Sequence, residues 1–312
     1  MKVALVASCF LDKDGLGNAL YDFALAFDYL GWEIGIFHQR EEGANSRGFS
    51  CEPLDLVDLL ASCVDGKPHP FFSYDLYIVT YQAHYPLMEV CRLIPQGHLL
   101  IYYPGVTPHQ FYLDEDPLKS FTRTAPRHLD LLDSADGVIV NSDYMKRELL
   151  QLHPMDEDML YVLPLAVSPL FDSERARKLK SLDLVADSKE EAASDDGIAE
   201  SVAHSLLYVG RISGNKRLDI LLRGFAEALK KNENLRLKIV GTFSRATSGE
   251  YDKRLEELLG DLEIAEQVSL FDGPAEDDLL EHYRSATCFV SASMHEGFCL
   301  PIAEAMSCGL PC

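Results

Sequence analysis

Short apolar runs, each ending at a glycine or a polar turn, recur along both halves of the chain. The first is Val3–Ala7, and it is followed by a turn at Asp14–Gly17. Apolar residues at helical spacing then run from Leu20 to Leu30, Gly31 ends this pattern, and Ile34–Phe37 forms the next run. A strand buried on both faces of a parallel sheet is apolar throughout, and strand, glycine turn, helix and strand in this order build doubly wound folds. The sequence therefore predicts an α/β protein with parallel sheets.

The same pattern divides the chain into domains. We expect residues 1–171 to form an N-terminal Rossmann-like domain and residues 204–312 a C-terminal one. Residues 172–203 are rich in charged residues, serine and alanine, which predicts a mobile acidic linker or insertion between the two. Further strands are predicted at Leu76–Tyr81, Leu99–Tyr103, Gly137–Asn141, Tyr161–Val167, Ser205–Gly210, Leu235–Val240, Val268–Phe271 and Cys288–Ala292.

Composition limits the function and the location. The net charge of −22 disfavours binding to nucleic acid, because a strongly acidic surface repels phosphate backbones. The eight cysteines include no Cys-x-x-Cys pair, which predicts reduced thiols and no zinc site. No apolar run approaches the length of a transmembrane segment. We expect a cytoplasmic protein, at most peripheral to a membrane.

The stretch 291–312 combines two carboxylates with a predicted helix start. Pro301 suits a first helical position and Gly309 suits the end, so a loop holding Glu296 leads into a short helix holding Glu304. The free backbone N–H groups at such a helix start attract anions. The alternative is that a glutamate there only compensates the helix dipole.

A second motif, Gly210-Arg211 followed by Lys216, comes at the end of the strand Ser205–Gly210 and before a predicted helix. Cations at a helix N-terminus oppose the helix dipole unless an anion is bound, so the pair predicts a phosphate site and not an ordinary cationic turn. On this reasoning, removing Lys216 should weaken anion binding and leave stability unchanged or slightly raised.

The run Glu-Gly-Phe-x-Leu-Pro-x-x-Glu-Ala-Met resembles the E-x7-E signature of family 4 retaining glycosyltransferases, and Gly-Arg-x4-Lys resembles the diphosphate clamp of the same family. The resemblance implies the GT-B fold, in which two Rossmann-like domains face a cleft. It implies transfer of a sugar from a nucleotide-diphosphate donor to an acceptor hydroxyl, with retention of configuration. Family members continue beyond the position of Cys312, so we expect the second domain to be incomplete and the chain to be a fragment.

Site residues follow from the resemblance. Arg211 and Lys216 would neutralise the departing diphosphate, Glu296 would lie beside the donor sugar, and Glu304 would hold the ribose. Cys299 stands where the family usually has glycine. The remaining donor-binding residues implied are Gly241, Gly297, Phe298, Cys299 and Leu300.

The N-terminal domain supplies the acceptor side by resemblance. Gly15 and Gly17 resemble the family's glycine loop, although they could serve only a tight turn. The aromatic stretch Ile101–Tyr112 has Pro104-Gly105 where some members have His-Asn, so the role of that family histidine does not transfer. His84 and His109 are nearby candidates for the acceptor side, although a lone histidine is more often a surface or packing residue.

No cofactor or metal is predicted, because no Asp-x-Asp motif can be placed at the site. The expected partners are the nucleotide-sugar donor and a saccharide or lipid-linked acceptor. Two alternatives stay open: another GT-B enzyme, such as an epimerase or a phosphorylase, and a truncated, inactive chain that binds nucleotide or a protein partner. A nicotinamide dehydrogenase is disfavoured, because the third glycine of its fingerprint and the acidic residue after the next strand are absent. An incomplete second sheet would also expose an apolar edge near Cys288–Ala292 or Val240 and favour association.

Overall fold

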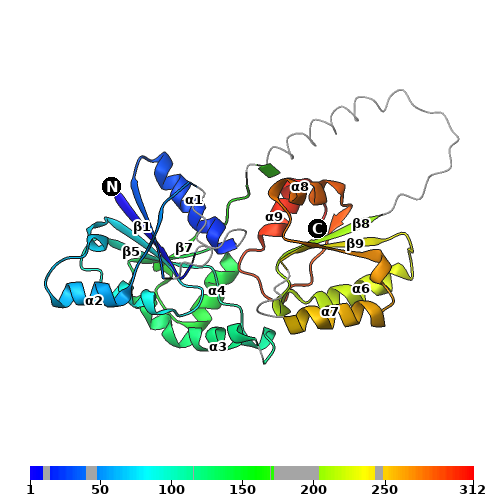
Figure 1. Cartoon of the computed structure of the whole chain (residues 1–312), viewed down its shortest axis with the longest axis horizontal. Helices are drawn as coiled ribbons and strands as arrows, with labels where there is room; N and C mark the ends of the chain where they lie inside the picture. The colour runs from blue at the N-terminus through cyan, green and yellow to red at the C-terminus, as the bar shows by residue number, and fades with distance from the viewer. Residues whose placement is uncertain (10–14, 40–47, 115, 169, 172–203, 243–248) are drawn as a thin grey trace, which may run out of the picture. The chain divides into compact units, whose positions relative to one another are not determined.

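A computed structural model describes the chain apart from residues 10–14, 40–47, 115, 169, 172–203 and 243–248 (Figure 1). The predicted linker 172–203 thus lies outside the described residues. Contacts divide the chain into two compact units. Unit 1 comprises Met1–His109 and Ser120–Ala166, and unit 2 comprises Gln110–Lys119 and Val167–Cys312.

Unit 1 holds a parallel sheet of seven strands in the order β3-β2-β1-β4-β5-β6-β7. The order reverses between β1 and β4, as in doubly wound folds. The predicted strands are confirmed, with small differences at their ends except in β7, which stops at Val162 where the prediction ran to Val167. β3 is an additional strand in a stretch predicted to be irregular. The strands are β1 (Lys2–Ala7), β2 (Glu33–His38), β3 (Cys51–Pro53), β4 (Leu76–Thr80), β5 (His98–Tyr103), β6 (Gly137–Val140) and β7 (Leu160–Val162).

Helices connect these strands, and local signals set their ends. Gly31 has φ 72°, a left-handed conformation that suits glycine just after a helix. The side chain of Ser142 accepts a hydrogen bond from the Met145 N–H at 3.2 Å and caps the helix that follows β6. The α-helices before residue 167 are α1 (Gly15–Tyr29), α2 (Leu56–Val64), α3 (Pro117–Thr124) and α4 (Asp143–Leu152), and the 3₁₀ segments are η1 (Pro70–Ser73), η2 (Pro86–Arg92), η3 (His109–Phe111), η4 (Ala125–Ser134) and η5 (Glu157–Met159).

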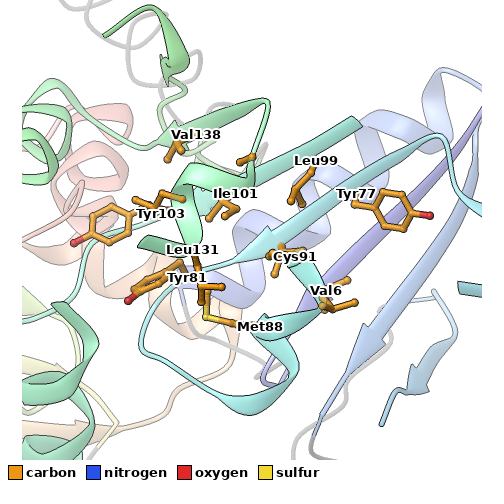
Figure 2. Packing of buried hydrophobic residues seen from close by; sticks show 14 of the residues in the cluster. Val6, Tyr77, Tyr81, Met88, Cys91, Leu99, Ile101, Tyr103, Leu131 and Val138 are labelled. Carbon is orange, nitrogen blue, oxygen red and sulfur yellow. The ribbon is translucent and has the colours of Figure 1, made fainter. Parts of the chain in front are cut away.

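Both faces of the unit 1 sheet are buried. Alternate residues of β1 point to opposite sides, so Ala4 and Val6 join one apolar cluster while Val3 and Leu5 join the other. Figure 2 shows the first cluster, where Met88 and Leu131 of the 3₁₀ segments pack on side chains of the central strands. This two-sided burial explains why the strands are continuous apolar runs in the sequence.

Unit 2 holds a parallel sheet of four strands in the order β10-β9-β8-β11. Helices α6 and α7 pack on one face and α8 and α9 on the other (Figure 1). The elements are β8 (Ser205–Val209), η6 (Gly214–Lys216), α6 (Leu218–Leu229), β9 (Arg236–Gly241), α7 (Gly249–Asp261), η7 (Ala265–Gln267), β10 (Val268–Asp272), α8 (Glu276–Ser285), β11 (Cys288–Phe289) and α9 (Leu300–Ser307).

The exposed edge predicted near Val240 is wrong, because β9 is an interior strand of the described sheet. At β11, which is two residues long where five were predicted, the Phe289 N–H donates to the Pro311 carbonyl at 2.7 Å. The segment after α9 therefore lies along this strand. All eight cysteines are free thiols. Within the described residues, no helix has the length and apolar character needed to cross a membrane.

Candidate functional site

Two loops of unit 2 meet at the carboxyl ends of neighbouring strands. One follows β8 and carries residues 210–217, and the other follows β11 and carries residues 290–299. β8 lies between β9 and β11. The chain therefore runs from β8 to β9 on one side of it, and β11 pairs with β8 on the other side. Ligands of open α/β sheets bind at such a reversal of strand order, outside the carboxyl ends of the strands. The two motifs singled out in the sequence lie at this point.

An ion pair joins the two loops. Lys216 Nζ lies 2.6 Å from Glu296 Oε1, across 80 residues of sequence. The two side chains are only 13% and 23% exposed, so the pair is screened by water much less than a surface pair. The structure therefore brings together the two catalytic candidates Lys216 and Glu296.

This pair corrects the argument from the helix dipole. Lys216 is not an uncompensated cation, because Glu296 neutralises it. The next residue, Arg217, is the N-cap of α6 and pairs through two nitrogens with both oxygens of Asp219, each at 2.9 Å. Both cations at this helix start thus have carboxylate partners in the protein itself, and the predicted neutral or favourable effect of removing Lys216 no longer follows.

Asn215, which the sequence reasoning missed, fastens the two loops together. Its side chain is buried and donates to the His295 carbonyl at 3.1 Å, and its own carbonyl accepts from the Met294 N–H at 2.8 Å. Ser213 Oγ donates to Asn215 Oδ1 at 2.8 Å. These bonds hold together the residues that directly precede Lys216 in one loop and Glu296 in the other. Only the position of Asn215 beside Lys216 hinted at this role.

Cys299 occupies a strained position next to the ion pair. It is the N-cap of α9 with φ 65° and ψ 62°, a left-handed conformation that glycine adopts freely and other residues adopt at a cost of about 1–2 kcal/mol. Burial, and then the nearby Glu296 carboxylate, raise the pKa of the Cys299 thiol to about 11, so the thiol stays protonated. The glycine usual in the family would suit this backbone better.

The second carboxylate of the motif, Glu304, is buried in α9 and only 9% exposed. Tyr283 of α8 donates its hydroxyl proton to Glu304 Oε2 at 2.7 Å. The three residues Gly297, Phe298 and Leu300 between the two glutamates are half-buried, and Pro301 lies in the first turn of α9, as predicted.

The other two candidates of unit 2 have different surroundings. Arg211 is exposed, and within the described residues its guanidinium forms no ion pair; its carbonyl accepts from the Tyr208 hydroxyl at 3.1 Å. Gly241 ends β9 so close to the carbonyl of Gly210 that a Cβ atom would overlap with it. Packing therefore explains this glycine, and donor binding by Gly241 stays a prediction.

In unit 1, the two glycines lie in a helix and not in a loop, because α1 already begins at Gly15 and includes Gly17. His84 is bound to Glu89 at 3.2 Å and stacks on the ring of His128 at 3.8 Å, an arrangement that serves packing. His109 begins η3 and is half-buried.

Gly105 has φ 98° and faces the Met145 sulfur closely, which explains a glycine where some family members have asparagine. Acceptor roles for His84 and His109 stay predictions. No group of three or more His, Cys, Asp or Glu side chains in the described part of the chain is arranged to hold a metal ion.

Comparison with known families gives a match in the second part of the chain. Residues 197–312 match the family described as glycosyl transferases group 1. The matched stretch contains both loops of the candidate site, including the Lys216–Glu296 pair.

Curated proteins are similar to more than half of the chain. A D-inositol 3-phosphate glycosyltransferase of Acidothermus cellulolyticus is 32% identical over 190 residues, which cover 58% of this chain and 38% of that protein. A protein of the same name from Thermomonospora curvata is 33% identical over 181 residues, 57% of this chain and 40% of its own length. The match thus spans about two fifths of these relatives.

Solved structures match over nearly the whole chain. A glycosyltransferase from Rickettsia africae gives a TM-score of 0.68 at 15% identity and covers 99% of this chain and 77% of its own. Sucrose-phosphate synthase from Thermosynechococcus elongatus gives 0.69 at 17% identity, with 99% and 80% covered. Anabaena HepE, solved in complex with UDP and glucose, gives 0.66 at 16% identity, with 100% and 79% covered. At these identities the likeness concerns the fold alone, and the predicted GT-B class with its two parallel α/β units is confirmed.

Proposed function

We propose that the chain is the catalytic part of a retaining glycosyltransferase that uses a nucleotide-diphosphate sugar. The observation that carries the proposal is the Lys216–Glu296 ion pair at 2.6 Å. It joins the Gly-Arg-x4-Lys motif to the E-x7-E motif at the strand-order reversal of the unit 2 sheet. The family match of residues 197–312 supports the same reaction class.

In the proposed reaction, the bond between the anomeric carbon and the diphosphate oxygen breaks and a bond from that carbon to the acceptor oxygen forms. The departing diphosphate takes up the proton of the acceptor hydroxyl. Lys216 and the exposed Arg211 bind the diphosphate, whose negative charge grows as it leaves. Cations placed in advance where charge develops stabilise a transition state. The diphosphate competes with Glu296 for Lys216, and we propose that Glu296 then turns to the hydroxyls of the donor sugar.

The rest of the E-x7-E motif binds the donor. Gly297, Phe298, Cys299 and Leu300 present the backbone that leads into α9, and Glu304 takes the ribose. We propose that the reaction needs no metal ion, which is tested by assaying with and without EDTA. Because the chain is similar to proteins named D-inositol 3-phosphate glycosyltransferases, a phosphorylated cyclic polyol is the acceptor class to assay first.

The experiment measures release of UDP, GDP or ADP from the corresponding sugar nucleotides, with and without D-inositol 3-phosphate and simple saccharides. Release that requires an acceptor, together with a product of unchanged anomeric configuration by NMR, supports the proposal. Epimerisation of the donor without an acceptor, or release that depends on inorganic phosphate, would assign an epimerase or a phosphorylase instead. Nucleotide binding without turnover would favour a binding module.

The assay includes two variants. Lys216→Ala is expected to lower donor affinity about ten- to a hundredfold, because a hydrogen bond to a charged group contributes about 1.5–3 kcal/mol. Lys230→Ala removes a lysine at the far end of α6 and should leave turnover unchanged. Equal activity of the two variants would contradict the role given to Lys216.

A further inference from the structure

Tyr283 of α8 is fully buried, and its ring is held on two sides. Phe171 meets it edge-on with ring centroids 5.5 Å apart, and Phe289 of β11 stacks on it at 6.5 Å. A ring packed in this way cannot swing to a new rotamer without opening the apolar cluster around it. The position of the Tyr283 hydroxyl is therefore fixed by the core of unit 2.

That hydroxyl reaches a charged group on the neighbouring helix. It lies 2.7 Å from Glu304 Oε2 and 3.3 Å from the Pro301 carbonyl. A phenol has one proton to donate, and the shorter distance to a carboxylate makes Glu304 the acceptor. Burial, and then the Glu304 carboxylate, raise the pKa of Tyr283 well above its usual value, so the phenol remains a donor at all physiological pH values.

A carboxylate is planar, so fixing one oxygen limits the directions in which the other can point. Glu304 is the residue to which the proposed function gives the donor ribose, and a ribose hydroxyl needs an acceptor in a defined place. The hydrogen bond from Tyr283 fixes the place of this acceptor. Tyr283 lies outside the E-x7-E motif, on the different helix α8.

We propose that Tyr283 is a positioning residue that orients Glu304 toward the ribose hydroxyls of the donor nucleotide. The inference rests on the proposed function, and it adds a determinant of ribose recognition that lies in α8. It predicts that loss of the Tyr283 hydroxyl reduces the preference for ribonucleotides over deoxyribonucleotides. If the hydroxyl had only a structural role, its loss would change stability and leave this preference unaltered.

The test measures binding by calorimetry with the whole chain. UDP, GDP and ADP are compared first, and the base that binds best is then used as the ribonucleoside, 2′-deoxy and 3′-deoxy diphosphates. The parent protein is expected to bind the ribonucleotide at least about tenfold more tightly than one deoxy form, as expected for a hydrogen bond to a charged acceptor. Tyr283→Phe keeps the ring and should reduce this ratio at least about threefold, with deoxynucleotide affinity nearly unchanged.

Two further variants sharpen the test. Glu304→Gln should reduce the same ratio, and Tyr283→Phe combined with Glu304→Gln should reduce it no further than Glu304→Gln alone, because both changes act through one contact. Tyr251→Phe is the matched control, since it removes another buried hydroxyl of unit 2, on α7, and should leave the ratio unchanged.

The outcomes separate the two levels of inference. If the parent protein discriminates riboses and Tyr283→Phe does so equally well, the role of Tyr283 is overturned and the proposed function stands. Additive effects in the double variant would also overturn it. If the parent protein binds none of the three diphosphates, both the proposed function and the role of Tyr283 are overturned.

Discussion

The Lys216–Glu296 pair has a natural counterpart in the same unit. Lys230 and Glu227 on α6 are also 2.6 Å apart, but their side chains are 67% and 71% exposed, against 13% and 23% for Lys216 and Glu296. Because the two distances are equal, a comparison of Lys216→Ala with Lys230→Ala isolates the effect of burial.

The expected difference can be worked out from these exposures. An exposed pair contributes about 0.2–1 kcal/mol, so Lys230→Ala should cost about 0.5 kcal/mol. Removing one partner of a fully buried pair costs about 3–5 kcal/mol, because the remaining charge is left without compensation. Glu296 retains some contact with water, so we expect about 2 kcal/mol for Lys216→Ala. The expected difference is about 1.5 kcal/mol, or roughly tenfold in an equilibrium constant.

The assay has to follow unit 2. The only tryptophan of the chain, Trp32, lies in unit 1, so its fluorescence reports on the other unit and serves as a control. Hydrogen exchange of the β8 and β9 amides measures opening of unit 2, and Lys216→Ala should speed it about tenfold more than Lys230→Ala does. Equal exchange rates in the two variants, or a slower rate in Lys216→Ala, would refute the reasoning and restore the sequence-based expectation.

Three further predictions concern backbone strain and pH. Cys299→Gly should leave unit 2 about 1 kcal/mol more stable than Cys299→Ala by hydrogen exchange, because glycine relieves the left-handed N-cap; at an ordinary helical position alanine would be the more stable. Gly105→Ala should cost unit 1 about 2–4 kcal/mol in urea unfolding followed by Trp32 fluorescence, because φ 98° and the Met145 sulfur both oppose a Cβ. The control Gly224→Ala, inside α6 of unit 2 with open space around it, should leave the exchange of the β8 and β9 amides unchanged or slower, and a loss of stability there similar to that of Gly105→Ala in unit 1 would contradict this account. Burial lowers the pKa of His282 in the folded chain, so the unfolded chain binds the proton more readily. The contribution of neutral His282 to stability is therefore present above about pH 6.5 and is lost as the pH falls toward the lowered pKa. His282→Gln should flatten the decline in stability below about pH 6.5, and an unchanged pH profile would count against this account.

Much of the fold follows from sequence pattern, because two-sided burial demands uninterrupted apolar runs and few other structures produce them. The β1 and β4 strands are read correctly for this reason. β3 is missed because it has only three residues, Cys51–Pro53, at a sheet edge, where one-sided pairing leaves no apolar signature. β11 is predicted too long, because the residues after Phe289 are apolar or small and still leave the sheet.

The sequence predicts which residues form the candidate site, but it predicts only some of the contacts between them. The spacing of Arg211, Lys216, Glu296 and Glu304 marks the two motifs, but spacing cannot show that a lysine and a glutamate 80 residues apart form an ion pair. The role of Asn215 depends on carbonyls of a distant loop. The left-handed conformation of Cys299 is set by the turn into α9, and only the departure from the family's glycine hinted at it.

The order of the strands in unit 2 has a consequence for how the protein folds. β8, β9 and β10 form a contiguous sheet through connections between successive strands, whereas β11 must return past both β9 and β10 to pair with β8. Closing that long loop has an entropic cost, which is recovered only when β11 docks. The contacts between residues 213–216 and 294–296 therefore arise last, when a chain emerging from the ribosome has delivered β11. Until then the nascent unit has a partly formed sheet, and the two loops that carry Lys216 and Glu296 have not yet come into contact.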